Sequence, residues 1–220
     1  MKANPASRAG DAFAFWELLV VVAIVVVLAA LLLPSLGKVK SGRRSQCMLN
    51  LTQLEVDVSL WADDHGGQFP WHISVTNGGS MEMDSSGRTS PHFRILALYA
   101  AIRPALFVCP SDKTRETAKD AAALDERNVS YFINLDSTTN NMKSVLFGDR
   151  HLEVSGQPVK PGLLTLTTNL SVRWTRELHS GNKTPFGFLA FSDGHVEGVG
   201  AQLPEVFQRQ GSLTNRLVIP

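Results

Sequence analysis

The sequence is poor in cysteine and in net charge, and both features limit what the protein can do. Its 220 residues carry 21 Lys and Arg against 20 Asp and Glu, a formal net charge of +1. A nucleic-acid-binding domain needs a basic surface, so we expect no nucleic-acid partner. The two cysteines, Cys47 and Cys109, form no CxxC motif and no paired Cys/His spacing, so the sequence predicts no zinc site.

Motifs of known catalytic chemistry are also missing. The sequence has no GxSxG nucleophile motif and no GxxxxGK[ST] phosphate loop. His151, His179, Asp193 and His195 are of the residue types that bind metals, but their spacing is not diagnostic. A hairpin turn explains Asp193-Gly194 without any metal. We therefore expect no catalytic residues, no metal and no enzyme activity.

What the sequence does contain is one long apolar run, from Phe13 to Leu36, with the single carboxylate Glu17 near its start and Pro34 near its end. About 20 apolar residues suffice to cross a bilayer, so the run predicts a transmembrane helix. An acid inside such a span costs about 2.5–3.5 kcal/mol and suggests a functional site. The alternative is a simple anchor with Glu17 at the interface.

Residues 1–12 are polar and resemble a leader peptide. The apolar run is too long for an ordinary cleaved secretory signal. If the protein is exported, its C-terminal part lies outside the cytoplasm. The basic residues that follow the run, Lys38, Lys40, Arg43 and Arg44, favour the opposite orientation.

After Pro34 the sequence becomes amphipathic. Apolar residues recur at spacings of four, three, four and three, which predicts one face of a helix: Cys47, Leu51, Leu54, Val58 and Trp61. Polar residues are expected on the other side: Arg44, Asn50, Gln53 and Asp57. Gly66-Gly67 should end this helix. Residues 13–36 and 37–65 are thus predicted to form the two halves of one long helix, weakened by Pro34, Gly37 and Gly42.

Residues 66–220 read as a mixed domain with an antiparallel sheet, so the expected fold class is α+β. Ser90-Pro91 should begin a short helix, with Ser90 as its N-cap. Strands are predicted at 129–134, 144–148, 162–168, 170–174 and 187–191. Asp193-Gly194 predicts a β-hairpin with a type I′ turn. Residues 111–127 should form a charged surface loop with a turn or two of helix.

Two questions stay open from the residues alone. Cys47 and Cys109 are equally compatible with one disulfide and with two separate buried thiols. Asp63 and Asp64 could contact calcium, although adjacent acids at a helix end are more often simply solvated. We expect no cofactor, with calcium as the exception to test.

Residues 13–34 resemble the N-terminal segment of type IV pilins and type II secretion pseudopilins. That family begins its mature chain with Phe, has Glu fifth and carries a proline late in the apolar half-helix; Phe13, Glu17 and Pro34 fall in this register. Pieces at 47–70, 107–112, 129–134, 146–151 and 191–198 resemble pseudopilin-like proteins of planctomycete- and verrucomicrobium-type bacteria.

The resemblance implies that a prepilin peptidase cleaves between Ala12 and Phe13 and that the new amine is methylated. Ala12 replaces the glycine that usually precedes the cut. The family pairs this amine with the fifth-position glutamate of a neighbouring subunit, here Glu17, and Pro34 belongs to the same assembly segment. The implied partners are the peptidase/methyltransferase, an inner-membrane assembly platform and other pilin or pseudopilin subunits.

The resemblance therefore implies a structural subunit of a pilus-like filament or a secretion pseudopilus. Its location would be the bacterial inner membrane, as a single-pass protein with residues 66–220 outside the cytoplasm. The long N-terminal helix would pack on a pilin-like globular domain. The alternative is a membrane-tethered exported domain with a binding or hydrolytic role, in which the helix serves only as an anchor.

Overall fold

A computed structural model describes residues 15–36, 39–167, 170–179, 184–200, 203–209 and 214–220. The chain divides into two compact units, Met1–Gly42 and Arg43–Pro220. The first unit contributes helix α1 (Phe15–Leu36), whose side chains are described for residues 15–30. The second contains nearly all of α2 (Val39–Asp64) and every strand.

The expectation of one long N-terminal helix is wrong. Helix α1 ends at Leu36 and a second helix, α2, begins at Val39. A proline two residues before the end of α1 removes one backbone donor, and glycines at 37 and 42 each disfavour helix by about 1 kcal/mol. Two shorter helices are the result.

The expectation of a transmembrane half-helix, and with it a single-pass location in the inner membrane, is also wrong. In the parts of the chain that the structure describes, no helix has the length and apolar content that a membrane crossing requires.

Helix α2 has the apolar face that its sequence predicts. Cys47, Leu51, Leu54 and Val58 are fully buried, and Trp61 is 1% exposed. The predicted polar side is only partly correct, because Asn50 and Asp57 are buried as well. Asn50 Nδ2 donates to the carbonyl of Val108 at 3.0 Å, which satisfies one of these polar groups.

The end of α2 follows its sequence signals. Gly66 and Gly67 both take positive φ, and the Gly67 amide donates to the carbonyl of Ala62 at 2.8 Å. His65 lies at this end, with Nδ1 2.7 Å from the Trp61 carbonyl and its ring stacked on Trp61. The predicted helix terminus is confirmed.

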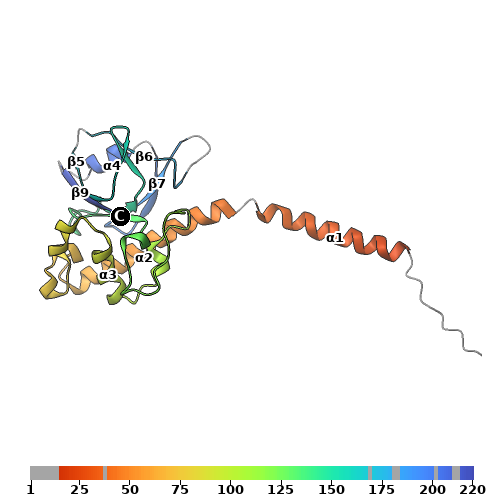
Figure 1. The fold of residues 1–220 in the computed structure, drawn as a ribbon, viewed down its shortest axis with the longest axis horizontal. Coiled ribbons are helices and arrows are strands. Elements are labelled where there is room, and N and C mark those ends of the chain that lie inside the picture. Colours follow the sequence, from red (N-terminus) through yellow and green to blue (C-terminus); the bar gives the residue numbers. More distant parts are fainter. Residues whose placement is uncertain (1–14, 37–38, 168–169, 180–183, 201–202, 210–213) are drawn as a thin grey trace, which may run out of the picture. The chain divides into compact units, whose positions relative to one another are not determined.

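The domain is α+β and is built on a six-stranded antiparallel sheet (Figure 1). The strand order is β5-β9-β1-β2-β7-β8. The strands run as follows: β5 (Gly162–Thr167), β9 (Thr214–Ile219), β1 (Tyr131–Asn134), β2 (Val145–Asp149), β7 (Gly187–Phe191) and β8 (Val196–Val199). A second sheet has the order β4-β3-β6, from Gln157–Pro158, Leu152–Val154 and Val172–Trp174.

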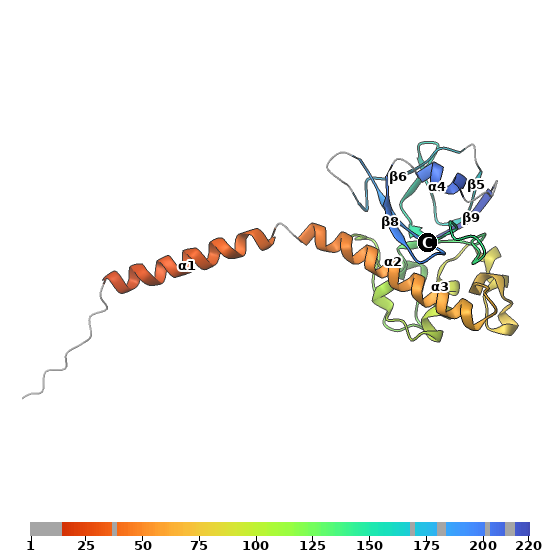
Figure 2. The same ribbon diagram turned by 180° about the vertical axis from the view of Figure 1, so that it is seen from behind.

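Both faces of the large sheet are buried, which gives the domain two apolar clusters. Alternate residues of β7 point to opposite faces: Phe188 and Ala190 join the cluster under α2, whereas Leu189 and Phe191 join the other. Helices α2 and α3 (Ser90–Tyr99) cover the first face, and β6 and α4 (Leu203–Arg209) lie on the second (Figures 1 and 2).

The predicted strands at 129–134, 144–148, 162–168, 170–174 and 187–191 correspond to β1, β2, β5, β6 and β7, with bounds shifted by up to two residues. Residue 168 lies outside the described residues. The sequence did not predict β3, β4, β9 or α4. Strand β9 pairs with both β1 and β5, so a central strand of the sheet was missed.

The predicted hairpin exists, but its turn type is wrong. Strands β7 and β8 pair antiparallel, and the Phe191 amide donates to the His195 carbonyl across a three-residue connection. Gly194 has φ +93°, whereas Asp193 has no positive φ. A type I′ turn needs positive φ at both central residues, so this is a type I turn followed by a left-handed glycine.

Helix α3 begins as predicted at Ser90, but its cap differs. The N-cap position is Thr89, whose side chain makes no cap bond. Instead, the carboxylate of Glu126 accepts from the Ser90 amide at 2.7 Å and from the Thr89 hydroxyl at 2.9 Å. A carboxylate from a distant segment thus satisfies this helix start.

The predicted loop at 111–127 contains no α-helix, and only the short 3-10 turn Glu126–Asn128 (η5) begins in it. Four further 3-10 turns lie between α2 and β1: η1 (Pro70–His72), η2 (Val75–Asn77), η3 (Met81–Ser86) and η4 (Pro104–Phe107). The segment is a loop as predicted, but it is only partly a surface loop, because Asp112, Ala118 and Leu124 are buried.

Gly148 tests the tight packing between β1, β2 and β7. A Cβ at this position would lie 2.5 Å from Leu189 Cδ2 and 2.6 Å from Phe132 Cε1. We expect Gly148→Ala to lower the free energy of unfolding by about 1–3 kcal/mol, through overpacking. Gly42→Ala, in α2 with no atom near its Cβ, should leave that free energy unchanged or raise it. Urea unfolding of both variants measures the difference, and equal effects would contradict the packing argument.

Candidate functional site

The residues predicted to act in processing and assembly lie in and before α1. Ala12 and Phe13 lie outside the described residues, and so does the leader, 1–12. Glu17 lies in the first turn of α1 and is exposed. A carboxylate there is favoured by the partial positive charge of the helix N-terminus. Pro34 falls within α1.

Within residues 15–30, the surface of α1 is largely apolar on every side. Over residues 15–28, twelve large apolar side chains are 38–75% exposed. Phe15 at 75% and Trp16 at 69% are the most exposed of them. Large contiguous apolar surfaces of this kind mark interaction sites. Within residues 15–30, Glu17 is the only residue with an ionisable side chain.

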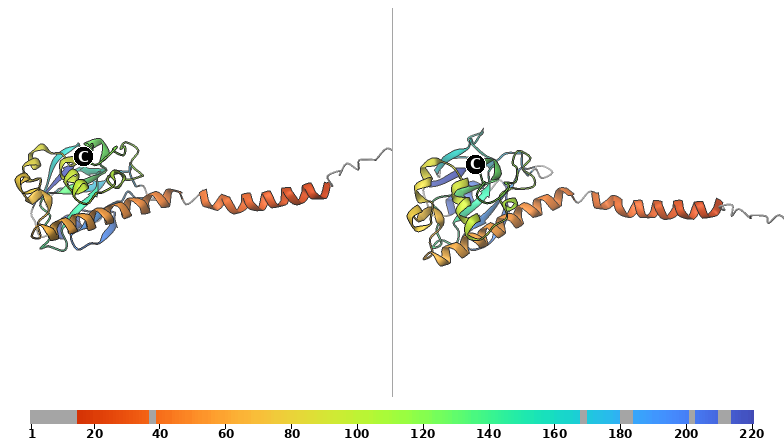
Figure 3. Two further views of the ribbon diagram at one scale, coloured as in Figure 1. Left: turned by 90° about the horizontal axis from the view of Figure 1, so that it is seen from below. Right: turned by 60° about the horizontal axis from the view of Figure 1, so that its bottom comes forward.

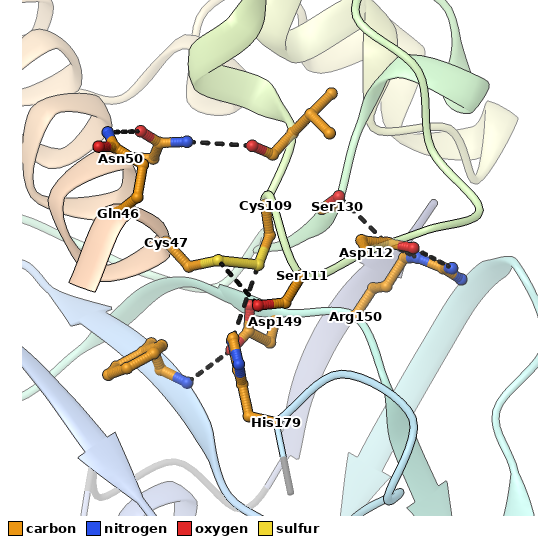
Figure 4. Close-up of a disulfide and its surroundings, with 12 residues drawn as sticks. Gln46, Cys47, Asn50, Cys109, Ser111, Asp112, Ser130, Asp149, Arg150 and His179 are labelled. Atoms are coloured by element: carbon orange, nitrogen blue, oxygen red, sulfur yellow. Dashed lines mark hydrogen bonds and ion pairs between the residues drawn. A yellow bond between two sulfur atoms is a disulfide. The ribbon is translucent and has the colours of Figure 1, made fainter. Parts of the chain in front are cut away.

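Inside the globular unit, the structure joins Cys47 to Cys109 in a disulfide (Figure 4). Their Cα atoms are 4.8 Å apart, and both residues are fully buried. Of the two alternatives that the sequence leaves open, the structure therefore has the bridge. It connects α2 to the segment after η4, across 62 positions of sequence.

A buried His–Asp pair lies directly against this disulfide. His179 Nε2 is 3.7 Å from Cys109 Sγ and 3.3 Å from Asp149 Oδ2 (Figure 4). Asp149 Oδ2 also accepts from the Phe188 amide at 2.8 Å. His179 is 1% exposed and Asp149 is fully buried, so both members of the pair lie in the interior of the protein. Burial, followed by the charge of Asp149, raises the pKa of the neighbouring Tyr131 well above its ordinary value.

A second buried carboxylate, Asp112, lies close by and is fully paired. Arg150 donates to it through Nε at 2.8 Å and through Nη2 at 3.2 Å, and the Ser130 hydroxyl donates at 3.0 Å (Figure 4). Burial raises the pKa of Asp112, but the hydrogen bonds and the charge of Arg150 outweigh it and bring the pKa to about 2.

The side chains considered for a metal site from sequence do not come together. His195 Nδ1 contacts the Asp193 carboxylate at the hairpin, while His151 Nε2 lies 3.4 Å from Glu177 Oε2. Burial, followed by the charge of Arg150, lowers the pKa of His151. Among the described residues, His179 is the histidine that belongs to a group of three candidate ligands, with the two cysteines, and Asp149 lies beside it.

Asp63 and Asp64, considered for calcium, are both exposed at the end of α2. The Tyr99 hydroxyl donates to Asp64 Oδ2. Among the described residues, the one group of three candidate metal ligands is Cys47, Cys109 and His179. Calcium binding at Asp63 and Asp64 therefore gains no support from geometry.

The cluster of Cys47, Cys109, His179 and Asp149 could not have been found from sequence. Its members come from α2, the segment after η4, the segment after β6, and the end of β2. No fixed spacing connects residues so far apart, and only the folded sheet places them together. The one available signal was an aspartate at the end of a buried strand, in the run FGDRH.

The disulfide should contribute strongly to stability. Closing a loop of 62 positions restricts the unfolded chain by about 4 kcal/mol on the chain-entropy model. We expect the double variant Cys47→Ala with Cys109→Ala to lose about that much free energy of unfolding in urea. Wild type treated with a reductant serves as the comparison. Alkylation of either cysteine in the native, unreduced protein would contradict the bridge.

The Asp112–Arg150 pair should make the protein sensitive to acid. Because the folded-state pKa of Asp112 is about 2, below its ordinary 3.8, its contribution is present above pH 4 and is lost as the pH falls to 2. The expected loss is about 2 kcal/mol of unfolding free energy. Denaturant unfolding at pH 2–6 should show this loss in wild type and in the exposed-site control Asp63→Asn, but not in Asp112→Asn. The same dependence of the unfolding free energy on pH in all three proteins would contradict this role of Asp112.

Comparison of the chain with protein-family models, curated proteins and solved structures found no match. The resemblance of residues 13–34 to pilins therefore remains an expectation from sequence, and function has to be argued from the geometry of the chain itself.

Proposed function

We propose that this protein is a structural subunit of a filament of the type IV pilus or secretion-pseudopilus kind, assembled through α1. The observation that carries the proposal is the exposed apolar surface of α1 with its single carboxylate, Glu17. A helix that is apolar on all sides requires burial against other chains or another apolar phase. Copies of the same helix are the partner that we propose.

The energetics favour several neighbours over one. A single neighbour covers about half of a helix, so about six of the twelve large apolar side chains would be buried. At about 1.5 kcal/mol each, they contribute about 9 kcal/mol. Association costs about 4–15 kcal/mol, so one neighbour barely offsets it. Neighbours on all sides leave a clear surplus, and this is the arrangement inside a filament.

Glu17 would fix how the subunits stack. A buried carboxylate is tolerated when an opposite charge pairs with it. Cleavage between Ala12 and Phe13 would create an amine four residues before Glu17, and methylation would leave it cationic. Pairing this amine with Glu17 of a neighbour gives a head-to-tail contact. Contacts that do not close into a ring generate helical filaments.

The globular unit is suited to being displayed along such a fibre. Helix α2 from Arg43 onward belongs to the same compact unit as both sheets, and the disulfide fastens it there (Figure 3). Its apolar face is already buried within that unit. Helix α1, with its apolar side chains exposed, is left for contacts between subunits.

The role of Glu17 can be tested by co-assembly. Tagged wild-type chain is mixed with untagged Glu17→Leu, and the amount of variant that sediments with the assembled wild type is measured. We expect a decrease of at least about tenfold, because about 1.4 kcal/mol of pairing is enough for that change. Glu17→Gln, which keeps the shape and removes the charge, should decrease it similarly.

Glu116→Leu is the matched control, because Glu116 is exposed in the globular unit. It should co-assemble as wild type does. Intact mass of the assembled subunit gives its first residue, expected to be methylated Phe13. Full co-assembly of Glu17→Leu, or a wild-type chain that stays monomeric, would refute the proposal.

A further inference from the structure

Three potential metal-binding residues meet in the interior of the globular unit, at the disulfide, and the carboxylate of Asp149 lies beside one of them. The sulfurs of Cys47 and Cys109 and a ring nitrogen of His179 all lie within 4.8 Å of one another. Asp149 Oδ2 lies 3.3 Å from His179 Nε2 (Figure 4). The side chains come from four segments of the chain, two of which are joined by the disulfide.

The separations around His179 match the edges of a tetrahedral zinc site. With Zn–S about 2.3 Å and Zn–N about 2.05 Å, a tetrahedron places nitrogen and sulfur about 3.6 Å apart. Cys109 Sγ lies 3.7 Å from Nε2. The same geometry places nitrogen and a carboxylate oxygen about 3.4 Å apart, against the 3.3 Å observed to Asp149 Oδ2.

The polar atoms of the cluster are not fully satisfied by the protein. Asp149 Oδ1 and His179 Nδ1 are buried and have no hydrogen-bond partner among the described residues. Asp149 is fully buried, and a buried carboxylate is costly unless a cation or several donors face it. A structural disulfide alone needs neither the histidine nor the carboxylate.

We propose that Cys47, Cys109, His179 and Asp149 form a binding site for one Zn²⁺ when the disulfide is reduced. The four ligands would be two thiolates, the neutral His179 Nε2 and Asp149 Oδ2. The chemistry selects zinc over calcium or magnesium, since two sulfurs and one imidazole suit a borderline-soft cation and hard cations prefer oxygen. The proposal does not rest on the function of α1.

The conversion of the disulfide form to the zinc-bound form balances in atoms and electrons. A dithiol reductant supplies two electrons and two protons, the S–S bond breaks, two thiols form and the reductant becomes a disulfide. Zn²⁺ then binds and displaces the two thiol protons to solvent. Two thiolates and one Zn²⁺ together have no net charge, and the disulfide that they replace has none either. The net charge of the site is therefore that of Asp149 in both forms.

The movement required is small. The two sulfurs of the disulfide must separate to about 3.8 Å, which is the edge of a tetrahedron with Zn–S of 2.3 Å. Each sulfur therefore moves by about 1 Å. The Cα atoms, 4.8 Å apart, need little change. While the disulfide is intact, neither sulfur is a thiolate, so the oxidised protein has too few ligands to bind the metal.

Metal titration of the full-length chain tests the site. The chain is prepared oxidised and, separately, reduced with a phosphine that is then removed, with its thiols counted. Co²⁺ serves as a spectroscopic probe and Zn²⁺ as its competitor. We expect the reduced chain to bind one Co²⁺ with sulfur-to-cobalt charge-transfer and tetrahedral visible bands, which Zn²⁺ abolishes. The oxidised chain should show neither.

His179→Ala should weaken binding by at least about tenfold, since a lost metal contact costs at least as much as a lost supporting hydrogen bond. His151→Ala is the matched control, a buried histidine outside the cluster, and should bind as wild type does. Should reduction loosen the fold, Zn²⁺ should restore the near-UV circular dichroism of wild type and of His151→Ala, but not of His179→Ala. The proposal is overturned if reduced wild type binds no Co²⁺ or Zn²⁺, or if His179→Ala binds equally tightly.

Discussion

The burial of both faces of the six-stranded sheet is the constraint on which the globular unit depends. A sheet in which every residue of β1, β2 and β7 is buried requires cover on each side. Helices α2 and α3 cover one face, and the small sheet with α4 covers the other. Helix α2 is therefore part of the core, and its disulfide to Cys109 holds it against the sheet.

Helices α1 and α2 differ in whether their apolar side chains are buried. Helix α2 has its apolar face buried inside its own unit, whereas the large apolar side chains described in α1 remain exposed. The same chain thus combines a self-sufficient unit with a segment that needs partners. That contrast favours an assembly role for α1 over the role of a passive extension, because the globular unit already buries its own apolar residues in two clusters.

The helices and strands that depend on local sequence patterns were predicted from the sequence. The buried face of α2 follows from helical spacing, and the strands β1, β2 and β7 follow from short apolar runs. Strand β9 was missed, because its partners β1 and β5 lie far away in the sequence. The turn at Asp193 was assigned the wrong type, because the Asp-Gly pair also suits a type I turn with a left-handed glycine. Continuity from α1 to α2 was wrong where Pro34, Gly37 and Gly42 weaken the helix.

The cluster around His179 shows why chemistry is harder to predict than packing. Each ligand looks ordinary in its own segment: a cysteine on an apolar helix face, a cysteine before a proline, an aspartate ending a strand. Only strand pairing, which brings Asp149 of β2 beside β7, and the bridge from α2 place them around one ring nitrogen. An interior that retains a carboxylate of which one oxygen has no hydrogen-bond partner among the described residues carries a cost that packing does not explain. A cation held in the reduced state supplies a physical reason for that carboxylate.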